Sequence, residues 1–149
     1  ARHWMHVGMV AYEGTKMSKS LGNLVFVRML RNLHDPRALR IAMLSHHYRA
    51  GFEWFDTDIE EGVTRLDRLI EAARRPCGPD PAPTLTAVRA ALDDDLDAPT
   101  ALDAIDVLAG AIIAHAGDDP SAPTGLREAA SLLGIHLDKS PAGDAPSGT

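Results

Sequence analysis

Hydrophobic residues recur at helical spacing along most of the chain beyond about residue 27. The clearest pattern lies at 57–73, where apolar residues fall at every third or fourth position and charged residues lie between them. This pattern predicts an amphipathic helix of about five turns, capped by Asp56 or Thr57. Asp35-Pro36 and Asp97-Ala98-Pro99 each place a capping carboxylate before a proline, which is typical of helix starts. Further helices are expected at 27–33, 36–47, 85–96, 98–112 and 126–133.

One segment has the character of a strand. Residues 4–12, WMHVGMVAY, are rich in β-branched, aromatic and methionine side chains and run into a glycine-bounded loop, which predicts a short buried strand. A single strand leaves its backbone N–H and C=O groups without partners. We therefore expect this mostly helical chain to be the C-terminal piece of a longer protein, whose N-terminal part supplies the remaining strands of a sheet.

Proline and glycine positions divide the chain. The segment 76–83, PCGPDPAP, holds four prolines, and we expect a linker because neither a helix interior nor a central strand tolerates them. The segment 117–125 has the residues of a loop, and the last residues have the composition of a disordered tail. The predicted parts are a strand-and-loop region (1–33), a connecting helical region (34–75), the linker (76–83), a C-terminal helical domain (84–137) and the tail (138–149).

Charge is distributed unevenly. The net charge is −6, but residues 1–75 carry +3 and residues 76–149 carry −9. An acidic C-terminal half is a poor surface for the phosphate backbone of a nucleic acid. Cys77 is the only cysteine and the histidines lack metal-binding spacing, so no metal site is predicted in this chain. No apolar run approaches the ~18 residues of a membrane span, and we expect a cytoplasmic protein without membrane contact that is a monomer.

The segment 14–23, GTKMSKSLGN, carries the candidate chemistry. Two lysines three residues apart alternate with two serines, and a glycine lies on either side. Lysine is a compact charge on a flexible stem, so a mobile loop with Lys16 and Lys19 could follow phosphate oxygens as charge moves. A solvated surface turn is the ordinary alternative for two lysines in a loop, and only the wider sequence context decides between the two.

That context resembles a known family. KMSKSLGN resembles the second signature motif of class I aminoacyl-tRNA synthetases, and 4–10, 35–49 and 92–102 are similar to segments of their cysteine-activating branch. The resemblance implies that residues 1–33 are the end of a Rossmann-type α/β catalytic domain, comprising its last strand and the lysine loop. A connecting region like a stem-contact fold and a helical bundle would follow.

The resemblance also implies a reaction and its site. The family activates cysteine with ATP and Mg²⁺, and the lysine loop stabilises the leaving pyrophosphate; Lys19 is the first candidate for that role and Lys16 the second. Residues expected to bind ATP or the adenylate are Gly8, Met9, Val10, Met17, Ser18 and Ser20. Gly8 suits close contact with adenine because it has no side chain.

Other side chains are expected to serve packing. Trp4, Trp54 and Tyr48 are assigned to core or interdomain contacts, and Arg40 and Arg49 to ion pairs between the sheet and the helices. Four methionines at apolar positions are expected to fill the core: Met5, Met9, Met29 and Met43.

Part of the family's machinery is absent from the sequence. The H-x-G-H motif is not present, and neither are the Zn²⁺ ligands by which the cysteine branch selects a thiol. We expect both in a missing N-terminal part and expect this chain alone to be inactive.

Two members of the cysteine branch remain as alternatives. The cysteine ligase of mycothiol biosynthesis joins L-cysteine to the amine of glucosaminyl-inositol, whereas cysteinyl-tRNA synthetase transfers it to tRNA. The segment 24–30, LVFVRML, resembles the ligase, and the short, acidic C-terminal part leaves little room for an anticodon-binding module. A non-catalytic helical binding module, or a remnant that has kept the loop, is the alternative of another class.

Overall fold

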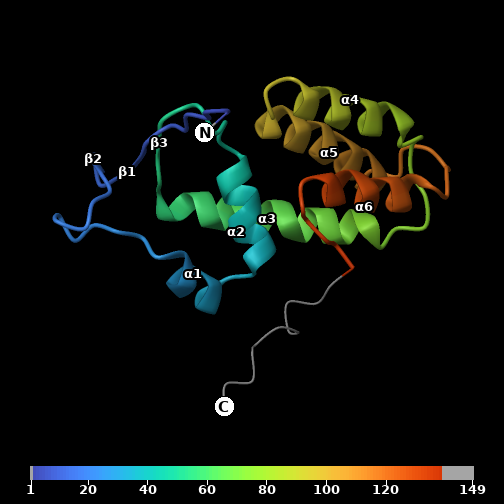
Figure 1. The fold of residues 1–149 in the computed structure, drawn as a ribbon. Helices are drawn as coiled ribbons and strands as arrows, with labels where there is room; N and C mark the ends of the chain where they lie inside the picture. The colour runs from blue at the N-terminus through green and yellow to red at the C-terminus, as the bar shows by residue number, and fades with distance from the viewer. Residues whose placement is uncertain (1, 139–149) are drawn as a thin grey trace, which may run out of the picture.

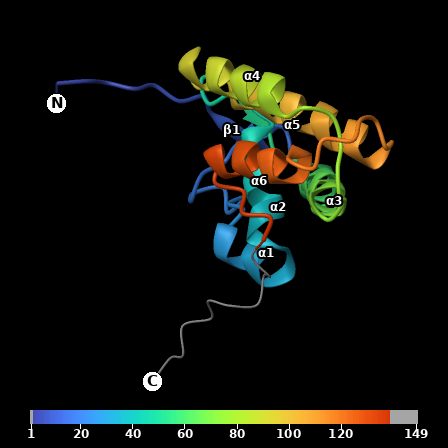
Figure 2. The same ribbon diagram turned by 90° about the vertical axis from the view of Figure 1, so that its right-hand side faces the viewer.

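The computed structural model describes residues 2–138, which form a helical bundle with a small three-stranded sheet beside it (Figure 1). Helices α4, α5 and α6 lie next to one another, and Figure 2 shows α3 end-on beside α5 and α6. The hairpin of β1 and β2 lies at the opposite end of the molecule from α6. The elements are β1 (Val10–Tyr12), β2 (Thr15–Lys16), α1 (Val27–Leu33), α2 (Pro36–Leu44), β3 (Phe52–Glu53), α3 (Asp56–Ala73), α4 (Ala82–Asp93), α5 (Ala98–Ile113) and α6 (Ala122–Leu132).

Two predicted helix caps are present and one is wrong. The Asp35 carboxylate accepts the backbone N–H of Arg37 at 2.8 Å, and the Asp97 carboxylate accepts that of Thr100 at 3.1 Å. Neither Asp56 nor Thr57 caps α3, because the helix already includes both. Phe55 occupies the cap position instead, and its backbone N–H donates to the Asp58 carboxylate at 2.6 Å.

Some helix boundaries also differ from the prediction. Helix α2 ends at Leu44, where the Ser45 hydroxyl donates to the Ile41 carbonyl at 3.0 Å, so the predicted end at residue 47 is too late. Helix α6 begins at Ala122 rather than 126, with Pro123 in its first turn, a position that needs no N–H donor. The segment 117–125 is therefore partly helical.

One hydrophobic core joins the helices on both sides of the proline-rich segment. Its members come from α2, α3, α4, α5 and α6, and Leu69, Leu102, Ile105, Ile112 and Leu126 are almost completely buried. The segment between α3 and α4 is fastened at Gly78, whose N–H and C=O bond to the backbone of Asp119 at 3.0 and 2.8 Å. The division of the complete protein at 76–83 stays a prediction.

The sheet has the order β2-β1-β3, with β1 antiparallel to β2 and parallel to β3. The prediction of a single strand at 4–12 is thus wrong in two ways. Within 4–12 only Val10–Tyr12 is a strand, and its partners lie in this chain, as the two-residue segments β2 and β3. Segments of two residues are too short to produce a sequence pattern.

Several residues assigned to the core are exposed in the described chain. Trp54 is buried, with 4% of its surface accessible, and Tyr48 is half-buried. Trp4 is 81% accessible, which contradicts a core position. The four methionines, Met5, Met9, Met29 and Met43, are all exposed as well, so their assignment to core filling is wrong here. Met5 and Met43 line an open cavity, Met9 lies on the N-terminal segment and Met29 lies on α1.

Two further predictions concern the tail of the chain and the absence of a membrane span. Of the predicted tail, residues 139–149 lie outside the described residues, while Asp138 forms an ion pair with Arg127 at 2.6 Å. A search of the described helices for one long and apolar enough to cross a membrane finds none.

Gly62 tests the packing of α2 on α3. A Cβ added to it would lie 2.5 Å from the Ala38 carbonyl oxygen. Gly→Ala inside a helix normally stabilises by about 1 kcal/mol, but overpacking against a rigid backbone costs about 1–3 kcal/mol. We expect Gly62→Ala to lower the thermal midpoint of the complete protein in a calorimetric scan. Gly110→Ala in α5 is the control, since its new Cβ would meet only the mobile end of Arg68; a higher midpoint for both variants would contradict the packing.

Candidate functional site

The candidate loop begins as a tight β-hairpin. Glu13 and Gly14 link β1 to β2, and both have positive φ, 53° and 73°, the conformation that two-residue hairpin turns of type I′ require. The Gly14 N–H donates to the Glu53 carboxylate at 2.6 Å. Since Glu53 lies in β3, the hairpin is fastened to the strand that follows α2. Sequence reasoning gave no role to Glu53, and nothing in the sequence pattern marks it.

Asn23 holds the lysine segment in place. Its side-chain carbonyl accepts the Ser18 N–H at 2.9 Å, and its amide donates to the Thr15 hydroxyl at 3.1 Å and the Lys16 carbonyl at 3.4 Å. The Asn23 side chain therefore bonds to Thr15, Lys16 and Ser18, and so joins the end of the loop to its beginning. The sequence signal for Asn23 was its position closing the motif, but the motif alone did not indicate which atoms it binds.

The two serines organise the turn between the lysines and Gly22. The hydroxyls of Ser18 and Ser20 lie 3.2 Å apart, and the Ser18 hydroxyl accepts the Leu21 N–H at 3.3 Å. Gly22 has a φ of 69°, and its N–H donates to the Lys19 carbonyl at 3.3 Å. The loop is thus internally bonded, and Ser18 in particular already uses its hydroxyl within it.

The lysines and Met17 face different surroundings. Lys16 and Lys19 are exposed, so their ammonium groups are available to an anion in solution. Met17 between them is half-buried and packs against the hydrophobic core near Val10. Met17 therefore anchors the loop, which places the two flanking cations on the outside.

The strand leading to the loop is tied to the segment after α2. The Gly8 N–H donates to the Tyr48 carbonyl at 2.7 Å, and the Met9 carbonyl accepts the Phe52 N–H at 3.1 Å. A Cβ on Gly8 would lie 1.9 Å from the Ala50 carbonyl oxygen. The chain's own backbone therefore accounts for glycine at position 8, whereas close contact with adenine was the reason expected from sequence.

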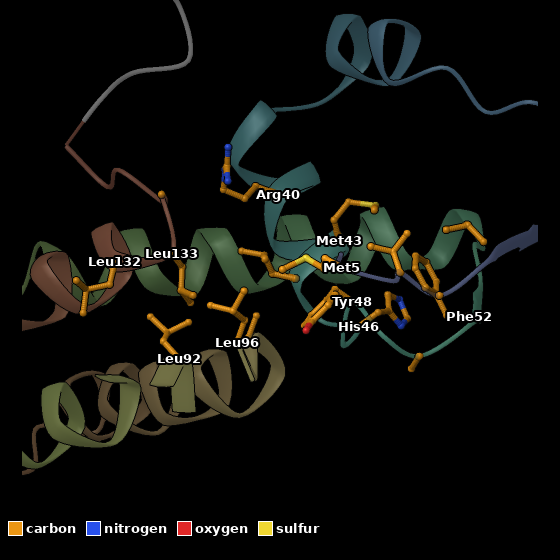
Figure 3. A pocket seen from close by; sticks show the side chains of 17 residues that line it. Met5, Arg40, Met43, His46, Tyr48, Phe52, Leu92, Leu96, Leu132 and Leu133 are labelled. Atoms are coloured by element: carbon orange, nitrogen blue, oxygen red, sulfur yellow. The ribbon is translucent and has the colours of Figure 1, made fainter. Parts of the chain in front are cut away.

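A cavity of about 720 Å³ opens beside this strand. Gly8 and Val10 line it, together with aromatic rings from the segment after α2 and leucines from the other helices (Figure 3). The His46 and Phe52 rings stack within it with centroids 3.9 Å apart. The described lining does not include Lys16 or Lys19. The structure thus places Gly8 and Val10 at the cavity, whereas Met9 and the predicted loop residues are not among its lining.

The two arginines assigned to ion pairs differ. Arg49 pairs with Asp95 in the turn between α4 and α5, at 2.5 Å, so its assignment to an ion pair is confirmed. For Arg40, no ion pair occurs within residues 2–138, and its side chain lies at the edge of the cavity instead. Hydrogen bonds from Arg49 and then Tyr48 hold the pKa of Asp95 well below its usual range.

Metal ions have no evident place in this part of the protein. Within residues 2–138, no three His, Cys, Asp or Glu side chains gather in a way that could hold a metal. Cys77 is a half-buried free thiol. The described residues therefore do not supply the three or more protein ligands that a Zn²⁺ site needs.

Asn23→Ala should loosen the lysine loop. Each lost hydrogen bond costs about 1 kcal/mol, so we expect trypsin to cleave the complete protein after Lys16 or Lys19 about tenfold faster, as followed by mass spectrometry. The control is Asn32→Ala, which alters an exposed asparagine on α1. Equal cleavage rates for the two variants would show that Asn23 does not restrain the loop.

Comparisons with known proteins agree on the relationship. Residues 1–64 match the family model described as the tRNA synthetases class I (C) catalytic domain. The L-cysteine:1D-myo-inositol 2-amino-2-deoxy-alpha-D-glucopyranoside ligase of Thermobifida fusca is 50% identical over 93% of this chain and 34% of its own length. The enzyme of the same name from Thermobispora bispora is 51% identical over 92% of this chain and 33% of its own.

A solved structure shares the fold. LeuRS of Agrobacterium radiobacter K84, in a ternary complex with tRNA and LeuAMS, superposes with a TM-score of 0.64 at 17% identity, over 91% of this chain and 24% of that one. The chain spans about a third of the length of the curated relatives it matches. It is therefore a homologue of one part of the L-cysteine:1D-myo-inositol 2-amino-2-deoxy-alpha-D-glucopyranoside ligases, and its first 64 residues are related to the class I (C) tRNA synthetase catalytic domain.

Proposed function

We propose that the complete protein is an ATP-dependent ligase that activates L-cysteine as cysteinyl-adenylate and joins it to the amine of 1D-myo-inositol 2-amino-2-deoxy-alpha-D-glucopyranoside, a step of mycothiol biosynthesis. The observation that carries the proposal is an intact KMSKS loop in a chain about half identical to ligases of that name over 93% of its length. The present chain supplies the loop and the strand before it. The Zn²⁺ that selects the thiol and the rest of the site belong to other parts of the complete protein.

The proposed first step is a displacement at phosphorus. The cysteine carboxylate attacks the α-phosphorus of ATP, the bond to the bridging oxygen breaks, and pyrophosphate leaves with the electron pair. Negative charge accumulates on the pyrophosphate, and positioned cations stabilise it. Lys19, with Lys16 second, is suited to this role because both are exposed and stand on either side of the anchored Met17.

The second step forms the amide. The amine of the sugar attacks the carbonyl carbon of the adenylate, AMP leaves, and the amine loses a proton. Within this chain, we assign Gly8, Met9 and Val10 to the adenine side of the site, where Gly8 and Val10 line the cavity. Ser20 is the serine better placed to contact phosphate, since the Ser18 hydroxyl accepts the Leu21 N–H.

The charge of the C-terminal helices favours the sugar over tRNA as acceptor. Arg89 pairs with Glu128 at 2.8 Å, and Arg127 pairs with Asp138. Both arginines in residues 76–138 are thus already matched to carboxylates on this acidic part of the chain. Binding of a phosphate backbone depends on cations that release counterions, so this bundle is poorly suited to it.

Lys19→Ala tests the adenylation role. We expect the rate of cysteine-dependent exchange between ATP and pyrophosphate, measured with the complete protein, to fall on the order of 10²-fold or more, as for other single contacts to a transition state. Arg28→Ala removes an exposed cation from nearby α1 and serves as the control. An unchanged rate for Lys19→Ala would remove this residue from the mechanism.

The acceptor is tested by offering both candidates together. With ATP and labelled cysteine, we expect the complete protein to label glucosaminyl-inositol through an amide and to leave the cysteine tRNA unlabelled. Esterified tRNA would identify the protein as a cysteinyl-tRNA synthetase. No exchange and no product would favour a non-catalytic helical module that has retained the loop.

A further inference from the structure

The segment 48–53 forms hydrogen bonds to the candidate site at three positions. Its Tyr48 carbonyl accepts the Gly8 N–H, its Phe52 N–H donates to Met9, and its Glu53 carboxylate accepts the Gly14 N–H at the tip of the hairpin. The Ala50 carbonyl fills the space beside Gly8. The position of this segment therefore determines the positions of the strand and the hairpin together.

The same segment is held on its other side by a single carboxylate. Asp95 accepts the Tyr48 hydroxyl at 2.6 Å and two guanidinium N–H groups of Arg49, from Nε at 2.5 Å and from Nη2 at 2.8 Å. The Arg49 guanidinium also lies 5.1 Å from the centre of the Tyr48 ring. Asp95 thus engages two consecutive side chains of the segment whose backbone supports Gly8.

Asp95 lies in a turn of unusual backbone geometry. Asp95 and Leu96, in consecutive positions, have φ values of 54° and 56°, and non-glycine residues in this region cost about 1 kcal/mol or more each. Hydrogen bonds to both neighbouring helices hold the turn in this conformation. The Asp97 N–H donates to the Ala91 carbonyl of α4 at 3.0 Å, and the Asp97 carboxylate caps α5. The backbone that carries the Asp95 carboxylate is therefore fixed between α4 and α5.

We propose that Asp95 is a positioning residue, which acts through Tyr48 and Arg49 to fix the strand Gly8–Val10 and the lysine hairpin relative to the helical bundle. The inference rests on the proposed function for its effect on the reaction, but not for its effect on the backbone. It gives the C-terminal helices a part in ATP binding without contact to the nucleotide. Misplacement of about 1 Å, transmitted from outside a site, costs up to about 10²-fold in rate.

An ordinary surface ion pair is the competing explanation. Arg49 and Asp95 are 53% and 44% accessible in their side chains, and exposed pairs contribute about 0–1 kcal/mol to stability. The Arg89–Glu128 pair provides a matched comparison, because it is equally exposed, at 56% and 51%, and joins α4 to α6 without contacting the segment 48–53.

The test compares Asp95→Asn with Glu128→Gln in the complete protein. Asparagine tolerates positive φ, so the turn is preserved while the carboxylate is lost. We expect amide hydrogen exchange to quicken at least fivefold in peptides covering 8–14 and 48–54 of Asp95→Asn, and to stay unchanged there in Glu128→Gln. In ATP–pyrophosphate exchange, we expect the KM for ATP to rise about tenfold in Asp95→Asn, with a smaller change in kcat.

Tyr48→Phe provides a second, milder variant that removes one hydroxyl, and we expect changes in the same direction. Unchanged hydrogen exchange at 8–14 in both variants, or a KM no different from that of Glu128→Gln, would overturn the proposal. If the wild-type protein shows no cysteine-dependent exchange at all, the proposed function fails, while the hydrogen-exchange comparison still decides whether Asp95 positions the strand.

Discussion

The short parallel pairing between β1 and β3 is the contact on which the placement of the lysine loop depends. Val10 and Ala11 pair with Phe52 and Glu53, and the Ala11 carbonyl accepts the Trp54 N–H at 2.8 Å. Trp54 is buried in the core next to α3. A few backbone hydrogen bonds therefore fix the position of the exposed loop relative to the helical bundle. A side chain at position 8 would prevent the strand from approaching closely enough to form them.

A second group of polar contacts joins helices α2, α3 and α5. Arg65 on α3 donates to Asp106 at 2.7 Å and Asp103 at 3.0 Å on α5, and to the Ser45 hydroxyl at the end of α2 at 3.1 Å. A guanidinium presents several donors in a fixed plane, which suits it to joining three elements at once. Since Ser45 precedes the segment 46–53, this junction also supports the start of the segment that reaches the candidate site.

Charge has different uses in the two halves of the chain. In the acidic C-terminal part, the arginines are matched to carboxylates within the protein. In the N-terminal part, Lys16 and Lys19 lie on a loop whose own hydrogen bonds are made by asparagine, serine and backbone groups. The loop is thus shaped without using its lysine ammonium groups, which leaves them for an anion.

The sequence by itself indicated where the helices lie and which family the loop resembles. Helix periodicity and the Asp-Pro starts are local signals, because capping and amphipathic spacing depend on residues a few positions apart, and KMSKSLGN needs no neighbours to be recognised. Only the tertiary structure decided that Phe52–Glu53 forms a strand, that Glu53 and Asn23 hold the loop, and that Asp95 meets Tyr48 and Arg49. These contacts join residues that are often some 40 positions apart, and no local pattern encodes such pairings because they arise from the packing of helices on one another.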